Sequence, residues 1–242
     1  MDETRVDLKG KLPSRHLVYD VDPAAISIRV LKGKDEKLIA EMTYENSARK
    51  LLSVLKNVLA GIDPEKLTLG DEKYIMLWLT INSYTPVTPL EFVCEGCMQK
   101  IQRDINLSEL EVKELPEGFK EPYPVKLSEG TVVNLRLLRT GDEIKILDYE
   151  KKDSSAWLYR YALSIVDDKV NIVDKVQMLE NMNACDLALI RAFHEKYDHG
   201  PIMESKYECP KCGFEGVVTV PFRLELFFPF GNTLKATFGN RV

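Results

Sequence analysis

The sequence predicts an α+β protein made of two tandem repeats, each with a strand, helices and a β-hairpin that carries a Cys-x-x-Cys turn. Three observations predict this class. A strand-and-helix pattern occurs twice at an offset of 107 residues, a Cys-x-x-Cys hairpin pattern occurs twice at an offset of 115 residues, and the two patterns keep the same order. With 242 residues, of which 45% are hydrophobic, the chain can bury a substantial core.

The strand-and-helix pattern reads ISIRVLKGKDEKLIA at 26–40 and VNLRLLRTGDEIKIL at 133–147. Each copy begins with alternating apolar and polar residues, which is typical of a half-buried strand. Each then passes a glycine and enters a charged helix start. In the second copy Thr140 stands three residues before Glu143, the spacing of a capping box. The corresponding charged positions are Arg29 with Arg136 and Asp35 with Asp142.

Helices are expected after each strand. Apolar side chains at helical spacing predict helices at 45–61 and 70–84 in the first half and at 153–166 and 185–197 in the second half. The hairpins follow at 89–107 and 202–224, where residues alternate on either side of the cysteines. The offset grows from 107 to 115, so the second copy needs about eight extra residues, which its long helical stretch can supply.

These patterns divide the chain into five segments. We expect an extended N-terminal arm, a first repeat, a linker rich in proline and glycine, a second repeat and an aromatic C-terminal tail. Their boundaries are 1–22, 23–111, 112–129, 130–225 and 226–242.

Four of the five cysteines form two Cys-x-x-Cys pairs, which predict one shared metal site. Four thiolates on two tight turns are the usual ligands of a structural zinc ion. The 111 residues between the pairs (98–208) exceed the spacing of a small zinc finger, but a repeated unit whose two hairpins meet explains the separation. The predicted ligands of one zinc ion per chain are Cys94, Cys97, Cys209 and Cys212.

Other interpretations of the cysteines stay open. Each pair could be redox-active, or the cysteines could stay reduced without a metal, although no convincing helix follows either pair as in thioredoxin-like sites. His199 lies ten residues before Cys209 and could replace a ligand, or it could be a surface histidine. Cys185 lies in a helical pattern and is expected to be a small buried side chain.

The C-terminal tail is rich in phenylalanine and is a candidate partner-binding segment. Aromatic side chains are enriched at the centres of protein interfaces. The alternative is that the tail packs on its own core. The candidate partner-binding residues are Phe227, Phe228 and Phe230.

Composition excludes several classes. No stretch reaches eighteen uninterrupted apolar residues, so we expect no membrane span, and the first residues lack the apolar core of a signal peptide, which favours a cytosolic protein. The net charge of −5 disfavours broad nucleic-acid binding. No phosphate-binding glycine loop, Ser–His–acid arrangement or HExxH motif is present, so we expect no enzymatic activity.

Taken in order, these motifs resemble the T-even-type bacteriophage baseplate protein family. The resemblance rests on LPSR at 12–15, the two strand-and-helix copies, LGDEKYIMLWLTINSY at 69–84, the two cysteine pairs and the closing FF at 227–228. The family usually shows CPxCG-like turns, and the first pair here, CEGC, departs from that pattern. The resemblance implies a non-enzymatic role in a contractile tail, with baseplate hub proteins and the tape-measure protein as partners. It places the protein in the host cytoplasm during assembly and in the virion baseplate.

Three functions compete at this stage. The first is a structural or assembly protein of the tail baseplate or hub. The second is a zinc-ribbon protein that binds nucleic acid or acts in transcription, which would require a basic surface near the cysteines; the charges there are mixed in sign. The third is a redox or hydrolytic enzyme, which only the cysteines support.

Overall fold

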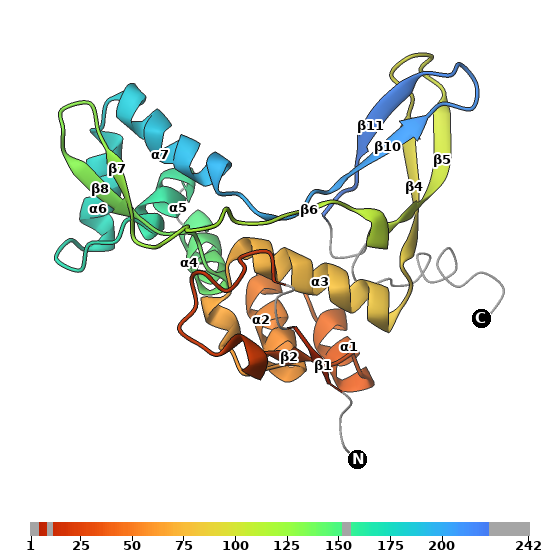
Figure 1. The fold of residues 1–242 in the computed structure, drawn as a ribbon, viewed down its shortest axis with the longest axis horizontal. Coiled ribbons are helices and arrows are strands. Elements are labelled where there is room, and N and C mark those ends of the chain that lie inside the picture. The colour runs from red at the N-terminus through yellow and green to blue at the C-terminus, as the bar shows by residue number, and fades with distance from the viewer. Residues whose placement is uncertain (1–4, 9–11, 152–155, 223–242) are drawn as a thin grey trace. The chain divides into compact units, whose positions relative to one another are not determined.

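The computed structural model describes residues 5–8, 12–151 and 156–222. The chain divides into two compact units, and each unit draws on both halves of the sequence. The first contains residues 1–72 and 114–200, and the second contains residues 73–113 and 201–242. Helices and small antiparallel sheets occur in separate places along the chain (Figure 1), which confirms the predicted α+β class. Among the described residues, no helix is long and apolar enough to cross a membrane.

The N-terminal half of the first unit packs two helices beside a small sheet. Strands β1 (Val6–Asp7), β2 (Ser27–Ile28) and β3 (Leu59–Ala60) form an antiparallel sheet in the order β1-β2-β3. Helices α1 (Gly33–Ala40) and α2 (Ser47–Val58) lie between β2 and β3 along the chain. Helix α2 buries one apolar face, as its 3.6-residue periodicity predicts; the buried side chains are Leu51, Leu52, Val54, Leu55 and Val58.

The second half of the first unit has its own hairpin and four helices. Its hairpin consists of β7 (Tyr123–Lys126) and β8 (Val132–Leu135). The helices are α4 (Thr140–Glu150), α5 (Ala156–Ser164), α6 (Ile172–Glu180) and α7 (Ala184–Lys196). The core shared by β8, α5, α6 and α7 includes Leu135, Ala162, Leu179, Ile190 and Phe193.

The second unit contains two β-hairpins that lie side by side (Figure 1). Helix α3 (Leu69–Ser83) begins in the first unit and enters the second. The first hairpin pairs β4 (Val87–Val93) with β5 (Lys100–Asn106), and the second pairs β10 (Glu204–Glu208) with β11 (Glu215–Thr219). The two-residue strands β6 (Val112–Lys113) and β9 (Gly200–Pro201) occur where the chain passes between the units.

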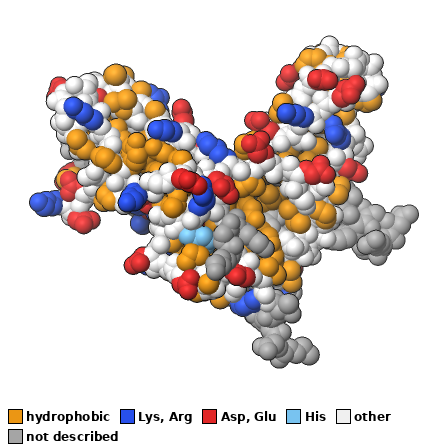
Figure 2. Space-filling view, in the orientation of Figure 1, with side chains coloured by type: hydrophobic (Ala, Val, Ile, Leu, Met, Phe, Trp, Pro, Cys, Tyr) orange, Lys and Arg blue, Asp and Glu red, His pale blue; other side chains and the backbone are white. Residues whose placement is uncertain are grey.

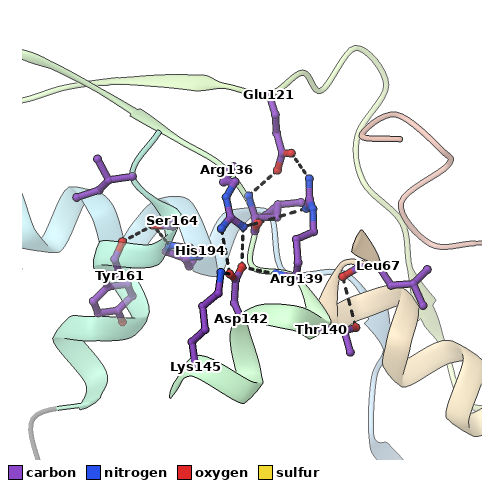
Figure 3. A network of polar contacts seen from close by, with 12 residues as sticks. Leu67, Glu121, Arg136, Arg139, Thr140, Asp142, Lys145, Tyr161, Ser164 and His194 are labelled. Carbon is purple, nitrogen blue, oxygen red and sulfur yellow. Dashed lines mark hydrogen bonds and ion pairs between the residues drawn. The ribbon is translucent and has the colours of Figure 1, made fainter. Parts of the chain in front are cut away.

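An arginine–aspartate pair occurs at the same place in both sequence copies, buried in the first and partly buried in the second. Arg29 Nη1 donates to Asp35 Oδ2 at 2.7 Å, and Arg136 Nη1 donates to Asp142 Oδ2 at 2.7 Å. In both copies the same Nη1 also donates to the next residue's carbonyl, at 2.8 and 3.0 Å. The aspartate in turn accepts the backbone N–H three residues earlier at 2.9 Å, which closes the first helical turn. Figure 3 shows the second copy, with Lys145 also contacting Asp142.

A backbone contact at the end of the second helix also occurs twice. Arg29 N donates to Val58 O at 3.1 Å, and Arg136 N donates to Ser164 O at 2.8 Å. The segments diverge next, because the first copy continues through a 3-10 turn at Pro64–Lys66 whereas the second contains α6. Helix α6 therefore lies where the offset between the copies increases.

The predicted capping box of the second copy is shifted by one residue. Helix α4 begins at Thr140, and its third residue is Asp142 rather than Glu143. Asp142 accepts from the backbone N–H of Arg139, so Arg139 is the N-cap residue. The ion pair between Asp142 and Arg136 favours this register, whereas the Ser/Thr-x-x-Glu spacing alone favours the neighbouring one.

Two segments expected to lie outside the repeats contribute to the core. Within 1–22, the described residues Leu8 and Leu12 are buried, and Ser14 N donates to Asp71 Oδ1 at 2.8 Å. Within 112–129, Leu115 and Phe119 belong to the core of the first unit. Single apolar side chains among prolines and charges lack the periodicity from which burial is predicted. The segment boundaries remain a prediction about sequence repeats, and the compact units follow a different division.

Candidate metal centre

Each Cys-x-x-Cys turn connects the two strands of a hairpin in the second unit. Residues 94–98 form knuckle 1 between β4 and β5, and residues 209–213 form knuckle 2 between β10 and β11. Met98 N donates to Cys94 O at 2.8 Å, and Gly213 N donates to Cys209 O at 2.9 Å. The two knuckles therefore share one backbone geometry, in which the first cysteine is buried within the hairpin end.

The four cysteine sulfurs lie close together and could bind one metal ion. All four Sγ atoms lie within 4.8 Å of one another. Two sulfur pairs lie close together across the hairpins: the distance from Cys94 Sγ to Cys212 Sγ and the distance from Cys97 Sγ to Cys209 Sγ are both 3.8 Å. A tetrahedral ion with metal–sulfur bonds of about 2.3 Å holds its sulfurs about 3.8 Å apart. The donor set and its spacing therefore fit a tetrahedral thiolate site.

Cys209 and Cys212 have different pKa values because their surroundings differ. The backbone N–H of Lys211, with that of Cys212, favours the Cys209 thiolate and lowers the pKa of Cys209 to about 6. At Cys212, the backbone N–H of Phe214 also favours the thiolate, but burial and the neighbouring sulfurs outweigh it and raise the pKa to about 12. Without a metal, four thiols so close together cannot all ionise, whereas a cation favours four thiolates.

The turn residue after each cysteine pair has a left-handed backbone. Gly213 has φ +71°, and the corresponding residue of knuckle 1, Met98, has φ +57°. Glycine adopts this region without steric cost, but a residue with a Cβ pays about 1–3 kcal/mol. The departure of CEGC from the glycine-containing pattern thus leaves the turn geometry unchanged and places a strained methionine there.

Aromatic rings pack beneath the knuckles. The rings of Phe92 and Tyr207, which occupy corresponding positions of the two hairpins, meet edge to face with centroids 4.6 Å apart. Phe214 lies against Gly96, where an added Cβ would come within 2.7 Å of Phe214 Cβ. The small core of this end also includes Ile101 and the buried cysteines. Sequence analysis did not identify Phe214 or Gly96; glycine between the cysteines was the available signal.

The remaining predicted site residues have other roles or lie elsewhere. Cys185 is exposed on α7, contrary to the expected burial. Both ring nitrogens of His199 have partners in the first unit: Nδ1 contacts Tyr197 O at 3.0 Å, and Nε2 contacts Thr68 Oγ1 at 2.7 Å. His199 is not part of the cysteine cluster. Phe227, Phe228 and Phe230 lie outside the described residues.

Sequence analysis also missed a buried polar network at the start of α3. Tyr19 OH donates to Asp71 Oδ2 at 2.5 Å, and Thr68 N donates to Tyr19 OH at 2.8 Å. Burial and the neighbouring Asp71 carboxylate raise the pKa of Tyr19 well above its usual value. Asp71 corresponds to Asp186 at the start of α7, which accepts from Ser128 N at 2.7 Å. The sequence signal was the LPSR motif, whose Ser14 binds Asp71.

These observations define the class of the protein: an α+β protein in which two β-hairpins bring four cysteines together as a potential metal site. The model of the family described as T4 bacteriophage base plate protein matches residues 5–229, so the chain belongs to that family. The match covers both sequence copies and both knuckles. No curated protein and no solved structure matches the chain.

Proposed function

We propose that the chain is a structural or assembly protein of a contractile phage tail baseplate or its hub, held together by one structural zinc ion. The observation that carries this proposal is the family match over residues 5–229. Its proposed partners are other baseplate hub proteins and the tape-measure protein, with the host cytoplasm as the place of assembly and the tail baseplate as the final location. No nucleic acid takes part in the proposed role.

The zinc assignment is supported by ligand type and spacing. Four cysteine sulfurs suit zinc or iron rather than oxygen-preferring cations such as magnesium. The four cysteine sulfurs would fill all four positions around a tetrahedral ion, which is characteristic of a structural zinc site and would leave no open position for substrate. When bound, zinc supplies charge balance for the thiolates and a covalent-like link between the hairpins.

A non-enzymatic role agrees with the burial of a pair that resembles a nucleophile and base. Thr68 Oγ1 and His199 Nε2 are 2.7 Å apart, as a hydroxyl nucleophile and its base would be. Thr68 is fully buried and His199 is nearly so, and Thr68 Oγ1 also accepts from Asp71 N at 3.2 Å. These contacts support a structural role at the start of α3.

We also infer that the two sequence halves are copies of one ancestral unit and that the two hairpins form a zinc-ribbon-like site with approximate twofold symmetry. The equivalent pairs Arg29–Asp35 and Arg136–Asp142 support common ancestry. Equal sulfur distances across the hairpins, 3.8 Å each, support the symmetry of the site. A twofold rotation that exchanges the two hairpins would exchange these two sulfur distances.

A gene deletion with complementation tests the role. Phage that lack this chain should yield tails without complete baseplates, and the wild-type gene supplied in trans should restore infectious particles. Cys185→Ser should restore them as well, because Cys185 is outside the cluster. Normal particle yield from the deletion would overturn the proposal. Mass spectrometry of purified virions then distinguishes a retained component from an assembly factor that leaves.

A further inference from the structure

We propose that knuckle 1 and the adjoining end of β4 form a docking tip, which inserts Met98 and Val93 into an apolar pocket with a basic rim on another baseplate protein. The inference rests on the proposed baseplate role. The two knuckles have the same backbone geometry but different side chains. The side chain of Met98 is 73% exposed, and that of Val93 is 47% exposed.

The strained backbone at Met98 indicates that its side chain has a role other than stabilising the fold. Its φ of +57° is a conformation in which glycine is unstrained, and knuckle 2 has Gly213 at the corresponding position with φ +71°. An added Cβ at Gly213 meets no atom within 4 Å, so space does not decide between the residues. Met98 is absent from the small core around the cysteines. Strain without a packing gain is typical of functional positions.

The position of Val93 extends the same apolar tip. Val93 is the last residue of β4 and pairs across the hairpin with Lys100, the first residue of β5. The corresponding residue of the second hairpin is Glu208, which lies opposite Glu215. The two knuckles therefore present different chemistry from equivalent positions: knuckle 1 presents apolar side chains and knuckle 2 presents a pair of like charges.

The charge around the tip indicates which charge the rim of the partner's pocket should carry. Acidic side chains gather toward the end of the hairpins (Figure 2, upper right). Glu95, Glu208 and Glu215 are exposed, and their carboxylates make no ion pair within the described part of the chain. Two lysines lie nearby, and both have partners: Lys100 is paired with Glu91 at 3.0 Å, and Lys211 Nζ donates to Gln99 Oε1 at 3.0 Å. A zinc ion on four thiolates adds a net charge of about −2. Lysine and arginine on the partner would complement this surface.

The flexibility of methionine suits an inserted side chain. Met has an unbranched, polarisable side chain that adapts to irregular apolar pockets, and it is common at binding surfaces. Acidic residues around an apolar centre give the arrangement of an interface, with a desolvated core and a polar rim. Nucleic acid is a poor fit, because its phosphates would meet the glutamates.

The test compares Met98→Gly with matched variants of the full-length chain loaded with zinc. The probes are the purified baseplate proteins of the same phage, mixed one at a time and measured by calorimetry and light scattering. At least one should bind the wild-type chain, and Met98→Gly should weaken that binding at least tenfold. Met98→Leu, which keeps an apolar side chain, and Val173→Ser, which alters an apolar side chain exposed in the first unit, should each change it less than threefold.

A second measurement separates interface from fold. Because glycine relieves the strained turn, Met98→Gly should keep one metal per chain and unfold at the same or a higher temperature than wild type. A lower melting temperature would show that Met98 supports the fold and would overturn the proposal. Unchanged binding by Met98→Gly would overturn it and leave the baseplate role intact. If none of the baseplate proteins binds the wild-type chain, both the docking tip and the proposed role fail.

Discussion

At the scale of single residues, the two arginine–aspartate pairs each connect a strand to the helix that follows it. The pair in the first copy is almost completely excluded from water, with side-chain exposures of 1% for Arg29 and 0% for Asp35. Such a pair costs desolvation energy, and its net contribution to stability is small compared with the cost of removing one partner. Its position suggests that it specifies where the helix begins.

Removal of the Asp35 carboxylate should be strongly destabilising. Asp35→Ala leaves the Arg29 guanidinium buried without its counter-charge, so we expect the free energy of unfolding to fall by about 3–5 kcal/mol. Urea unfolding followed by circular dichroism measures the change. The control is Arg49→Ala, which breaks a solvent-exposed pair with Asp148 and should cost less than about 1 kcal/mol. Equal effects of the two variants would contradict this role of the buried pair.

His194 should make the first unit sensitive to acid. Burial, with the nearby Arg160 and Arg136 guanidinium groups, lowers the pKa of His194 from 6.5 to about 4. The unfolded chain therefore takes up the proton at a higher pH than the folded chain does. The free energy of unfolding should decrease as the pH falls from 6.5 to about 4, by at most about 3 kcal/mol, and this histidine contributes no further change below that range.

The variant that isolates this effect is His194→Gln, which retains a polar side chain beside Ser164 without a titratable ring. Urea unfolding of both proteins between pH 7 and pH 4 gives the difference in stability at each pH. That difference should shrink on acidification, because only the wild type loses stability through His194. A difference that stays constant across this range would rule out the assigned pKa.

At the scale of elements, the two hairpins of the second unit depend on their common end. Each is a two-stranded sheet, which has little stability alone in water. The core at the knuckles contains few residues, and three of its members are cysteines. A bound metal ion thus supplies a large share of the interactions that hold the hairpins together.

Loss of a single ligand should therefore unfold the hairpins. Cys94→Ser should reduce bound zinc from about one per chain to below a tenth, measured by plasma mass spectrometry, and should abolish the amide protection of β4, β5, β10 and β11 in hydrogen exchange. Cys185→Ser is the matched control because that cysteine is exposed on α7. Wild-type protein purified with two zinc ions per chain, or with none under reducing conditions, would contradict a single shared site.

The close packing of knuckle 1 against Phe214 predicts a second sensitive position. Gly96→Ala places a Cβ within 2.7 Å of Phe214 Cβ and 2.8 Å of Cγ, and the Cβ of Phe214 cannot move without its backbone. We expect a loss of about 1–3 kcal/mol and weaker zinc retention against a chelator. Gly33→Ala adds a Cβ in open space at the start of α1 and should be neutral or stabilising. Equal zinc retention by both variants would show that the knuckle can adjust.

At the scale of the whole molecule, the chain should unfold in two steps, of which one depends on the metal. Each unit contains one of the two tryptophans: Trp78 is in the second unit and Trp157 is in the first. A chelator should lower the melting temperature reported by Trp78 fluorescence in a Trp157→Phe variant. The transition reported by Trp157 in a Trp78→Phe variant should shift much less. Identical shifts would show that the two units unfold as one.

The sequence permitted prediction of the features that depend on local patterns. The cysteine spacing indicated the metal cluster, and alternating residues indicated the strands that precede α1 and α4. Burial of Leu115 and Phe119 depends on contacts with helices distant in sequence, so no local pattern reports it. The buried Arg29–Asp35 pair was also missed, because the same letters describe a solvent-exposed strand and a charged helix start. Composition of the compact units depends on long-range packing in the same way.

The order of the cysteines along the chain has a consequence for biosynthesis. A ribosome releases Cys94 and Cys97 more than a hundred residues before Cys209 and Cys212. Until the last pair emerges, the first holds only half of a coordination sphere and the hairpin that carries it has no partner. A nascent chain that terminates early can complete most of the first unit but cannot close the metal site. Only chains synthesised at least through Cys212 therefore carry all four candidate metal ligands.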